Sequence, residues 1–361
     1  MLEIGIIGLP NVGKSTIFNA LTKAHAEVAN YPFATIDKNI GVVAVPDPRL
    51  EALLPVYSRG ERIPKSTPTT IEFIDIAGLV KGASRGEGLG NQFLAHIREV
   101  SAVAHVVRCF EDPDIVHVTG RVDPINDIAT IHTELALADI GTLEKRLERL
   151  RRSAKASKVD ADLVEQCETV IDELSAGIPA RNSQVALPQE FPLLTAKPVI
   201  YICNVSEADL TQDNPYLAEV HKVAADEGAE VVVISAKIEQ ELTELSESDA
   251  QEFLGDLGIE TTGLTRLINK SYALLDLLTF FSGNTKEIHA WTVTSGTKAP
   301  AAAGKIHTDF ERGFIRAEVI EWDKAVEAGS ISRAKTHGWV RTEGKDYVVK
   351  DGDVIQFLFS V

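Results

Sequence analysis

The residues with the clearest chemistry form a glycine-rich segment near the start of the chain. Residues 8–15 read Gly8-Leu9-Pro10-Asn11-Val12-Gly13-Lys14-Ser15, which matches the phosphate-binding pattern G-x-x-x-x-G-K-[ST]. An apolar run, Ile4–Ile7, precedes the segment and a helix-like stretch, Ser15–Lys23, follows it. In this strand–loop–helix context, backbone N–H groups surround the phosphates of a nucleotide. We expect Lys14 to contact the β- and γ-phosphates and Ser15 to ligate Mg²⁺.

Two further segments are candidates to complete a magnesium and γ-phosphate site. Asp75 and Gly78 form a D-x-x-G pattern after the apolar run Ile71–Ile74. There the acid can hold Mg²⁺ through a water molecule, and the Gly78 N–H can contact the γ-phosphate. Thr35 lies in a proline-containing segment and can add a hydroxyl ligand to Mg²⁺ when the γ-phosphate is present. An ordinary turn is the alternative for the first segment, and a surface loop for the second.

The residue that positions the attacking water is less clear from the sequence. Ras-type enzymes place a glutamine directly after the glycine of D-x-x-G, but this chain has Leu79 there. Leucine cannot activate water, so slow hydrolysis or another polar group is implied. His117 is one candidate, whereas His96 and His105 fit ordinary helix and strand positions.

The choice of base depends on residues 204–207. GTPases of this architecture carry N-K-x-D here, and the aspartate pairs with N1 and N2 of guanine. This chain has Asn204-Val205-Ser206-Glu207. Asn204 can bind the N7/N6 edge of adenine while Val205 packs against the ring, and Ser235 and Ala236 supply a backbone contact. Because adenine has no amine at C2, a carboxylate at that position would be unpaired, and we predict that ATP is preferred over GTP.

The pattern of elements predicts an α/β fold. Apolar β-branched runs alternate with helical stretches, which indicates a doubly wound, mostly parallel sheet with ligands at the carboxyl ends of its strands. Residues 125–185 interrupt this pattern with two long amphipathic stretches, expected to form an antiparallel coiled-coil hairpin. The expected domains are a nucleotide-binding domain over 1–279, with this insertion, and a small α+β domain over 280–361. In the latter, strands are expected on both sides of a tight turn at Asp351-Gly352.

Composition narrows the class of protein and its partners. The 361-residue chain has a net charge of −17, which disfavours non-specific binding to nucleic acid, and we expect no DNA partner. We see no export signal or membrane-spanning run, and three scattered cysteines fit a reducing cytoplasm. Residues 141–158 nevertheless carry seven Lys and Arg against two Glu. At the end of a helical arm they could bind RNA phosphates, or they could simply be a solvated face.

The chain resembles the YchF family, the Obg-related ribosome-binding ATPases. The resemblance runs end to end through residues 8–16, 75–83, 86–91, 204–207, 307–310 and 350–354. It implies a P-loop ATPase with Mg²⁺, a C-terminal TGS domain of β-grasp type, association with the ribosome and a monomer. It also implies that Asn11, Val12, Gly13, Lys14, Ser15 and Thr16 form the ATP loop, that Ser15 and Thr35 bind Mg²⁺, and that Asn204 and Val205 contact the base.

Two alternatives remain open at this stage. One is a GTP-dependent switch with a tolerant base pocket. The other is an RNA- or ribosome-binding module for which the nucleotide is only a structural ligand.

Overall fold

The structure, a computed structural model, describes residues 3–24, 40–60, 62–76, 89–153, 158–188 and 190–360. It divides into a first unit, residues 1–42 with 72–270, and a second unit, residues 43–71 with 271–361. Thr35, Gly78 and Leu79 lie outside the described residues. Within the described ranges, no helix is both long enough and apolar enough to span a membrane.

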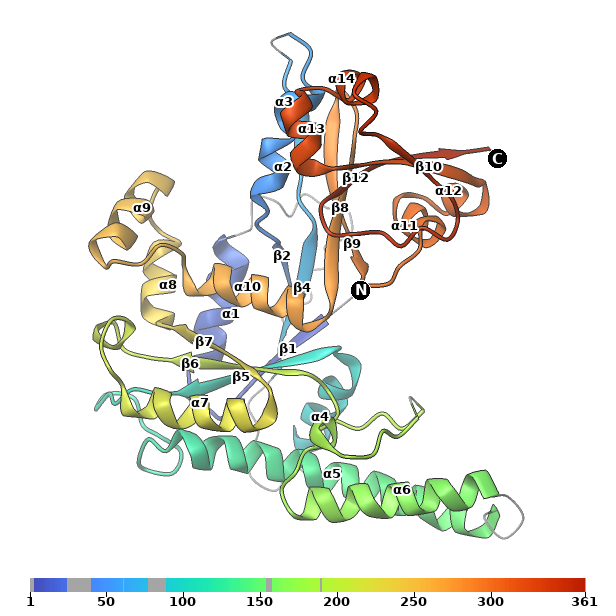
Figure 1. The fold of residues 1–361 in the computed structure, drawn as a ribbon. Helices are drawn as coiled ribbons and strands as arrows, with labels where there is room; N and C mark the ends of the chain where they lie inside the picture. The colour runs from blue at the N-terminus through green and yellow to red at the C-terminus, as the bar shows by residue number, and fades with distance from the viewer. Residues whose placement is uncertain are drawn as a thin grey trace. The chain divides into compact units, whose positions relative to one another are not determined.

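A six-stranded sheet with the order β2-β4-β1-β5-β6-β7 forms the centre of the first unit (Figure 1). Its strands are β1 (Glu3–Ile7), β2 (Ile40–Ala44), β4 (Thr70–Asp75), β5 (Ala102–Arg108), β6 (Val199–Asn204) and β7 (Glu230–Ile234). The neighbours from β4 to β7 are parallel, and Ile6 pairs with Asp75. Every residue of β5 and β6 is buried, as expected of central strands covered on both faces. The sheet confirms the predicted α/β fold and brings the carboxyl ends of β1 and β4 together.

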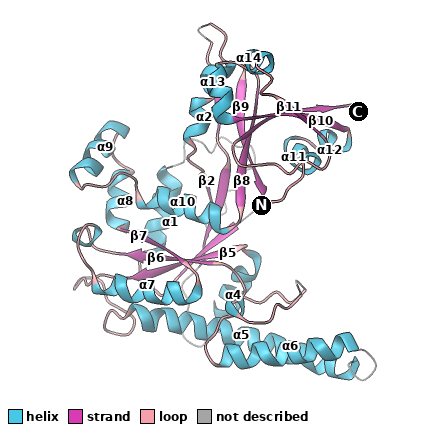
Figure 2. Cartoon of the chain, in the orientation of Figure 1, coloured by secondary structure: helices cyan, strands magenta, loops and turns pink. Residues whose placement is uncertain are grey.

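Helices cover both faces of this sheet. Helices α1 and α8 lie on one face and α5 and α7 on the other, as Figures 1 and 2 both show. The helices are α1 (Lys14–Ala24), α4 (Leu89–Glu99), α5 (Pro124–Ser153), α6 (Lys158–Ser175), α7 (Pro215–Glu227), α8 (Ala236–Leu242), α9 (Glu247–Asp256) and α10 (Gly263–Leu274). Local signals set their ends. In α7, Asn214 caps the first turn, Pro215 takes the first helical position and Gly228 ends the helix with φ 65°.

Helices α5 and α6 form the expected antiparallel hairpin, which extends past the edge of the sheet (Figure 1). Its apolar seam is narrow and includes Leu143 and Leu147 of α5 and Cys167 and Val170 of α6, all fully or nearly fully buried. Leu143 and Leu147 are one helical turn apart, and Cys167 and Val170 are three residues apart, so each pair lies on one face of its helix. We use "the arm" below for residues 124–175.

A second six-stranded sheet, with the order β11-β10-β12-β8-β9-β3, forms the second unit. Its strands are β3 (Lys65–Thr67), β8 (Leu277–Gly283), β9 (Glu287–Thr294), β10 (Phe314–Glu321), β11 (Arg341–Glu343) and β12 (Asp353–Phe359). Its helices are α2 (Pro48–Ala52), α3 (Leu54–Tyr57), α11 (Ala299–Ile306), α12 (Thr308–Arg312), α13 (Trp322–Ala328) and α14 (Ile331–Thr336).

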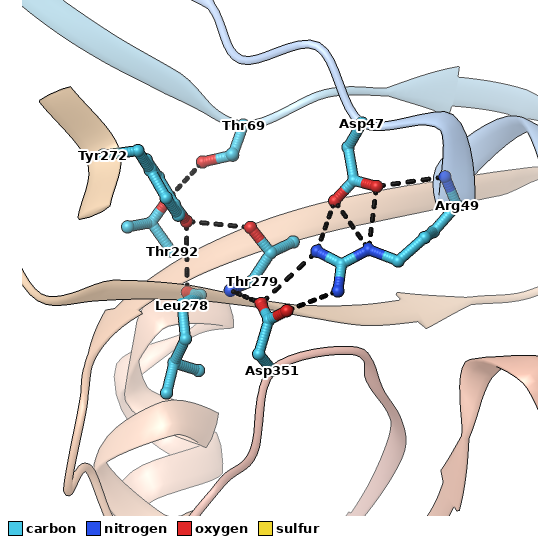
Figure 3. A network of polar contacts seen from close by, with 8 residues as sticks. All are labelled: Asp47, Arg49, Thr69, Tyr272, Leu278, Thr279, Thr292 and Asp351. Carbon is cyan, nitrogen blue, oxygen red and sulfur yellow. Dashed lines mark hydrogen bonds and ion pairs between the residues drawn. The ribbon is translucent and has the colours of Figure 1, made fainter. Parts of the chain in front are cut away.

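The division into units differs from the expected domains, because residues 43–71 belong with the C-terminal sheet. Leu50, Leu53 and Val56 share one apolar core with residues of β8, β9 and β12. Polar contacts support the same association (Figure 3). Arg49 Nη1 donates to Asp351 Oδ2 at 2.5 Å, and Arg49 Nε donates to Asp47 Oδ1 at 2.9 Å.

The expected pair of strands around Asp351-Gly352 is wrong. Only the residues after the turn form a strand, β12, and it pairs with β10 and β8. The residues before the turn run elsewhere: Val349 N donates to Thr297 O at 2.9 Å, and Val348 makes only an isolated bridge to Lys298. The Asp351 side chain accepts from Thr279 N at 2.9 Å (Figure 3), so this Asp-Gly pair connects to β8 and does not close a hairpin.

Candidate nucleotide-binding site

The loop between β1 and α1 turns through three residues with positive φ: Gly8 (152°), Asn11 (63°) and Gly13 (100°). A Cβ atom at Gly8 would lie 2.5 Å from the Val106 carbonyl oxygen. At Gly13 it would collide with the Asn204 amide. Both glycines of the motif are therefore required by backbone conformation and by space. Helix α1 begins at Lys14, so the unpaired N–H groups of its first turn follow the loop directly and can receive an anion.

Lys14 is buried within this loop, with 8 % of its surface exposed. Its ammonium group donates to the Leu9 carbonyl oxygen at 2.7 Å, which places it over the loop that would surround the phosphates. Burial lowers the pKa of Lys14 from 10.5 to about 8, while the nearby Asp75 carboxylate partly opposes the shift. The protein's own groups therefore compensate the charge on Lys14 only in part, and a phosphate would supply the missing negative charge.

Ser15 and Asp75 meet where the carboxyl ends of β1 and β4 lie side by side. The Ser15 hydroxyl donates to Asp75 Oδ2 at 3.1 Å. The other carboxylate oxygen, Asp75 Oδ1, is buried and has no hydrogen-bond partner among the described residues. A hydroxyl oxygen and a carboxylate oxygen with unused capacity fit Mg²⁺, which prefers oxygen ligands and takes the rest from phosphates and water. The pair that the sequence suggested for the metal is thus in contact.

Asn204 connects the phosphate loop to the end of β7. Its amide Nδ2 donates to the Val12 carbonyl oxygen at 2.9 Å, and its Oδ1 accepts from Ala236 N at 3.0 Å. The side chain is 3 % exposed. Asn204 therefore connects the phosphate loop to the first residue of α8. Its second amide hydrogen and the second lone pair of Oδ1 have no partner among the described residues and can pair with a base.

The other expected base-side residues lie around Asn204. Val205 is buried and its N–H donates to Ile234 O at 2.9 Å. Ser235, directly before α8, is 2 % exposed, and its hydroxyl has no hydrogen-bond partner among the described residues. Glu207, by contrast, is exposed. The carboxylate that would mimic a guanine-binding aspartate is thus not held in a polar pocket.

His117 is buried, and both of its ring nitrogens are engaged. Nδ1 lies 2.9 Å from the Thr119 hydroxyl, and Nε2 lies 3.0 Å from Asp127 Oδ2, in the first turn of α5. To orient a water molecule, the imidazole would have to release one of these two contacts. These contacts therefore place His117 against the start of the arm, and a catalytic role requires a change in them.

Arg108 is a residue of this region that the sequence analysis did not single out. It is 1 % exposed at the end of β5, and its guanidinium donates to the carbonyl oxygens of Phe110, Ile115 and Asp112 at 2.9–3.3 Å. The loop so fixed contacts the phosphate loop, because Asn11 Nδ2 donates to Val116 O at 3.2 Å. The sequence feature that could have pointed to Arg108 is a charged residue at the end of a mostly apolar strand.

Family models match two parts of the chain. Residues 3–153 match the family model MMR_HSR1, described as "50S ribosome-binding GTPase". Residues 277–360 match YchF-GTPase_C, described as a protein of unknown function.

Curated relatives match along the whole chain. The chain is 53 % identical to "Ribosome-binding ATPase YchF" of Haemophilus influenzae, covering 99 % of both proteins, and 51 % identical to that of Bacillus subtilis, covering 100 % of both. A solved structure, the Schizosaccharomyces pombe YchF GTPase, superimposes with a TM-score of 0.87 at 37 % identity, covering 99 % of this chain and 97 % of that one. The chain belongs to the YchF family.

Proposed function

We propose that this protein is a Mg²⁺-dependent ATPase that acts as a nucleotide-dependent switch on the ribosome. The observation that carries the proposal is the contact between Ser15 and Asp75 beside the phosphate loop. In this proposal Lys14 neutralises the β- and γ-phosphates, and the two oxygens hold Mg²⁺ with Thr35. The Gly78 N–H contacts the γ-phosphate. Magnesium supplies neutralisation of the charge that develops on the phosphates.

The preference for ATP over GTP rests on the surroundings of Asn204. Guanine selectivity in this architecture needs a carboxylate to accept hydrogens from N1 and N2. Glu207 is exposed and Val205 is apolar and buried, so the pocket offers no such acceptor from these two residues. The free hydrogen and lone pair of Asn204 match the N7/N6 edge of adenine, and the backbone at Ser235 and Ala236 closes the same side. An unpaired guanine amine would lose affinity.

Hydrolysis needs a group that orients water, and His117 is our candidate within the described residues. Its contact with Asp127 would have to open when the nucleotide binds. The Asn11–Val116 hydrogen bond gives the phosphate loop a direct contact with the His117 loop. We expect a slow intrinsic rate, because both ring nitrogens of His117 already have partners within the protein.

The switch would be transmitted through α5. This helix carries Asp127, which binds His117, in its first turn, and it runs for 30 residues, roughly 45 Å, along the arm. Two of the basic residues in its second half have partners in the protein: Arg146 stacks on an aromatic ring at 4.0 Å, and Arg151 pairs with a glutamate of α6 at 2.7 Å. Lys145, Arg149 and Arg152 are exposed and are our candidates for binding ribosomal RNA phosphates. We further propose that the protein acts as a monomer in the cytoplasm.

Two other functions keep a specific observation in their favour. The relative from Schizosaccharomyces pombe is described as a GTPase, which favours a GTP-dependent switch. The exposed bases of the arm favour an RNA-binding module with a structural nucleotide. Under the module reading, Lys14→Ala lowers thermal stability but leaves ribosome binding independent of nucleotide. Under the switch reading, it abolishes turnover and removes the effect of ATP on ribosome binding.

The experiment is co-sedimentation with purified ribosomes, with ATP, with ADP and without nucleotide. We compare the unmodified protein with Lys14→Ala, Lys145→Glu/Arg149→Glu, and a matched charge control, Lys222→Glu/Lys345→Glu, in which both residues are exposed and outside the arm. The proposal predicts nucleotide-dependent binding that Lys14→Ala uncouples, that the arm variant weakens and that the control retains. Equal binding in all nucleotide states by the unmodified protein would refute the switch.

A further inference from the structure

A cavity of about 480 Å³ lies between the sheet of the first unit and helix α5, and no residue of the phosphate loop, 8–15, lines it. Val103, His105 and Val199 line it from the sheet. Ile128, Ile131 and Leu135 line it from α5, and the segment after α6 closes it through Ile178, Arg181 and Thr195. Its volume is in the range of small-molecule sites. A void of this size with mainly aliphatic walls would be costly if left empty, so we ask which occupant it fits.

The aliphatic wall continues to the protein surface. Leu137 and Ile178 line the cavity and are 48 % and 41 % exposed, which is unusual for large aliphatic side chains. They mark where an apolar molecule can enter without crossing a polar barrier. The body of an occupant is therefore apolar.

The charged side chains that line the cavity are cationic within the described part of the chain. Arg181 and Lys197 line it, and among the residues that the structure describes no aspartate or glutamate does, although the whole chain has a net charge of −17. The Lys197 ammonium donates to the carbonyl oxygens of Arg98, at 3.1 Å, and Val100. Burial lowers the pKa of Lys197, and the Asp139 carboxylate partly opposes this shift. Arg181 Nε is buried and has no hydrogen-bond partner among the described residues.

A partly buried polar cluster holds Arg181 in place beside the cavity. Its guanidinium pairs with the Glu227 carboxylate, and Glu227 also accepts from the Tyr201 hydroxyl at 2.9 Å. Tyr201 lies 3.1 Å from His132 Nε2, and His132 lines the cavity from α5. Burial lowers the pKa of His132 to about 4, so it is a neutral polar group at physiological pH. The cluster holds the Arg181–Glu227 ion pair next to aliphatic walls, and the buried Arg181 Nε is the donor left for the head of an anionic amphiphile.

We propose that this cavity binds a small amphiphilic monocarboxylate, with its aliphatic chain against α5 and its carboxylate near Arg181 and Lys197. The site is separate from nucleotide binding and does not depend on the proposed ATPase activity. A bound molecule would lie against the root of the arm, between α5 and the sheet.

The test uses the full chain and titration calorimetry with decanoate, below its micelle concentration. Decanol is the uncharged partner of equal chain length, and acetate is the carboxylate without a chain. Ala136→Leu fills the cavity from α5, and Ala218→Leu is the matched control on an exposed position of α7. Lys197→Met removes one cation with a side chain of similar length. Circular dichroism checks that each variant is folded.

We expect saturable, one-to-one binding of decanoate, at least tenfold tighter than decanol, with no detectable binding of acetate. Ala136→Leu should weaken decanoate binding at least tenfold, and Ala218→Leu should not change it. Lys197→Met should reduce the preference for decanoate over decanol. If decanoate does not saturate, or if decanol binds as tightly, the assignment is wrong. Decanoate binding that Ala136→Leu leaves unchanged places the ligand elsewhere and equally overturns it.

Discussion

The buried state of Lys14 predicts that nucleotide binding is coupled to proton uptake. In the ligand-free protein, burial lowers the pKa of Lys14 to about 8, from 10.5. A bound diphosphate restores the opposite charge, so the pKa in the complex should return to at least its ordinary value. The difference of roughly 2.5 pKa units corresponds to roughly 3 kcal/mol between the two protonation states. Phosphate binding at high pH must therefore include protonation of this lysine.

The affinity for ADP should then fall about tenfold for each pH unit above 8, until the pKa of the complex is reached. At pH 9 about 0.9 protons should be taken up for each ADP bound, since roughly nine-tenths of the ligand-free Lys14 is deprotonated one unit above its pKa. Titration calorimetry in two buffers of different ionisation enthalpy measures this number directly. The phosphates of ADP do not contribute, because they are fully ionised in this range.

The lowered pKa of Lys14 also predicts how the stability of the protein changes with pH. Between pH 8 and 10.5 the unfolded chain holds a proton on Lys14 that the folded, ligand-free protein has lost, so the free energy of unfolding should rise with pH. Lys14→Met should lack this rise and also the proton uptake. If the unmodified protein binds ADP with the same affinity from pH 7.5 to 9.5 and takes up no proton, our reading of Lys14 is refuted.

Three further changes test other parts of the structure. Asn204→Ala removes the hydrogen bonds to the phosphate loop and to Ala236, each worth about 1–3 kcal/mol when a buried partner is left unpaired; calorimetry should show ADP affinity at least tenfold lower, and unchanged affinity would contradict its connecting role. Glu239 is 5 % exposed and burial raises its pKa to about 7, so the folded state keeps a proton that the unfolded chain releases near pH 4.5. Stability should thus fall by roughly 3 kcal/mol from pH 4.5 to 7 because of this group, and Glu239→Gln should flatten the urea-unfolding profile; equal slopes would count against it. Arg49→Met breaks the contacts with two aspartates in the second unit (Figure 3) and should lower the unfolding free energy by about 2 kcal/mol, whereas a loss below 0.5 kcal/mol would show that the contacts are only surface pairs.

Much of the phosphate side of the site could be predicted from the sequence. Three sequence features suffice to place Lys14, Ser15 and Asp75 together. They are the eight-residue motif, the apolar strand before it and an acid at the end of another strand. Parallel strands bring their carboxyl ends to one edge, so the contact of Ser15 with Asp75 follows from chain order and sheet topology.

Other features depend on long-range packing that no local pattern encodes. Leu50, Leu53 and Val56 have the spacing of a short helix, but their core partners come from strands more than 200 residues later. The prediction of a strand before Asp351-Gly352 was wrong for the same reason. These residues contact residues 297 and 298 and do not form a local hairpin. The contacts of the two His117 ring nitrogens could not be predicted either. Nothing in the sequence marks Asp127 and Thr119 as their partners, and only the folded structure shows them.

The most direct test of the proposed ATPase is kcat/KM for ATP and for GTP, measured side by side as phosphate release. The assay contains excess Mg²⁺, with a chelated control and with purified ribosomes added in a parallel series. We predict that ATP is the better substrate by at least tenfold, that chelation abolishes turnover and that ribosomes raise the rate. A kcat/KM for GTP equal to or above that for ATP would contradict our reading of Asn204, Val205 and Glu207.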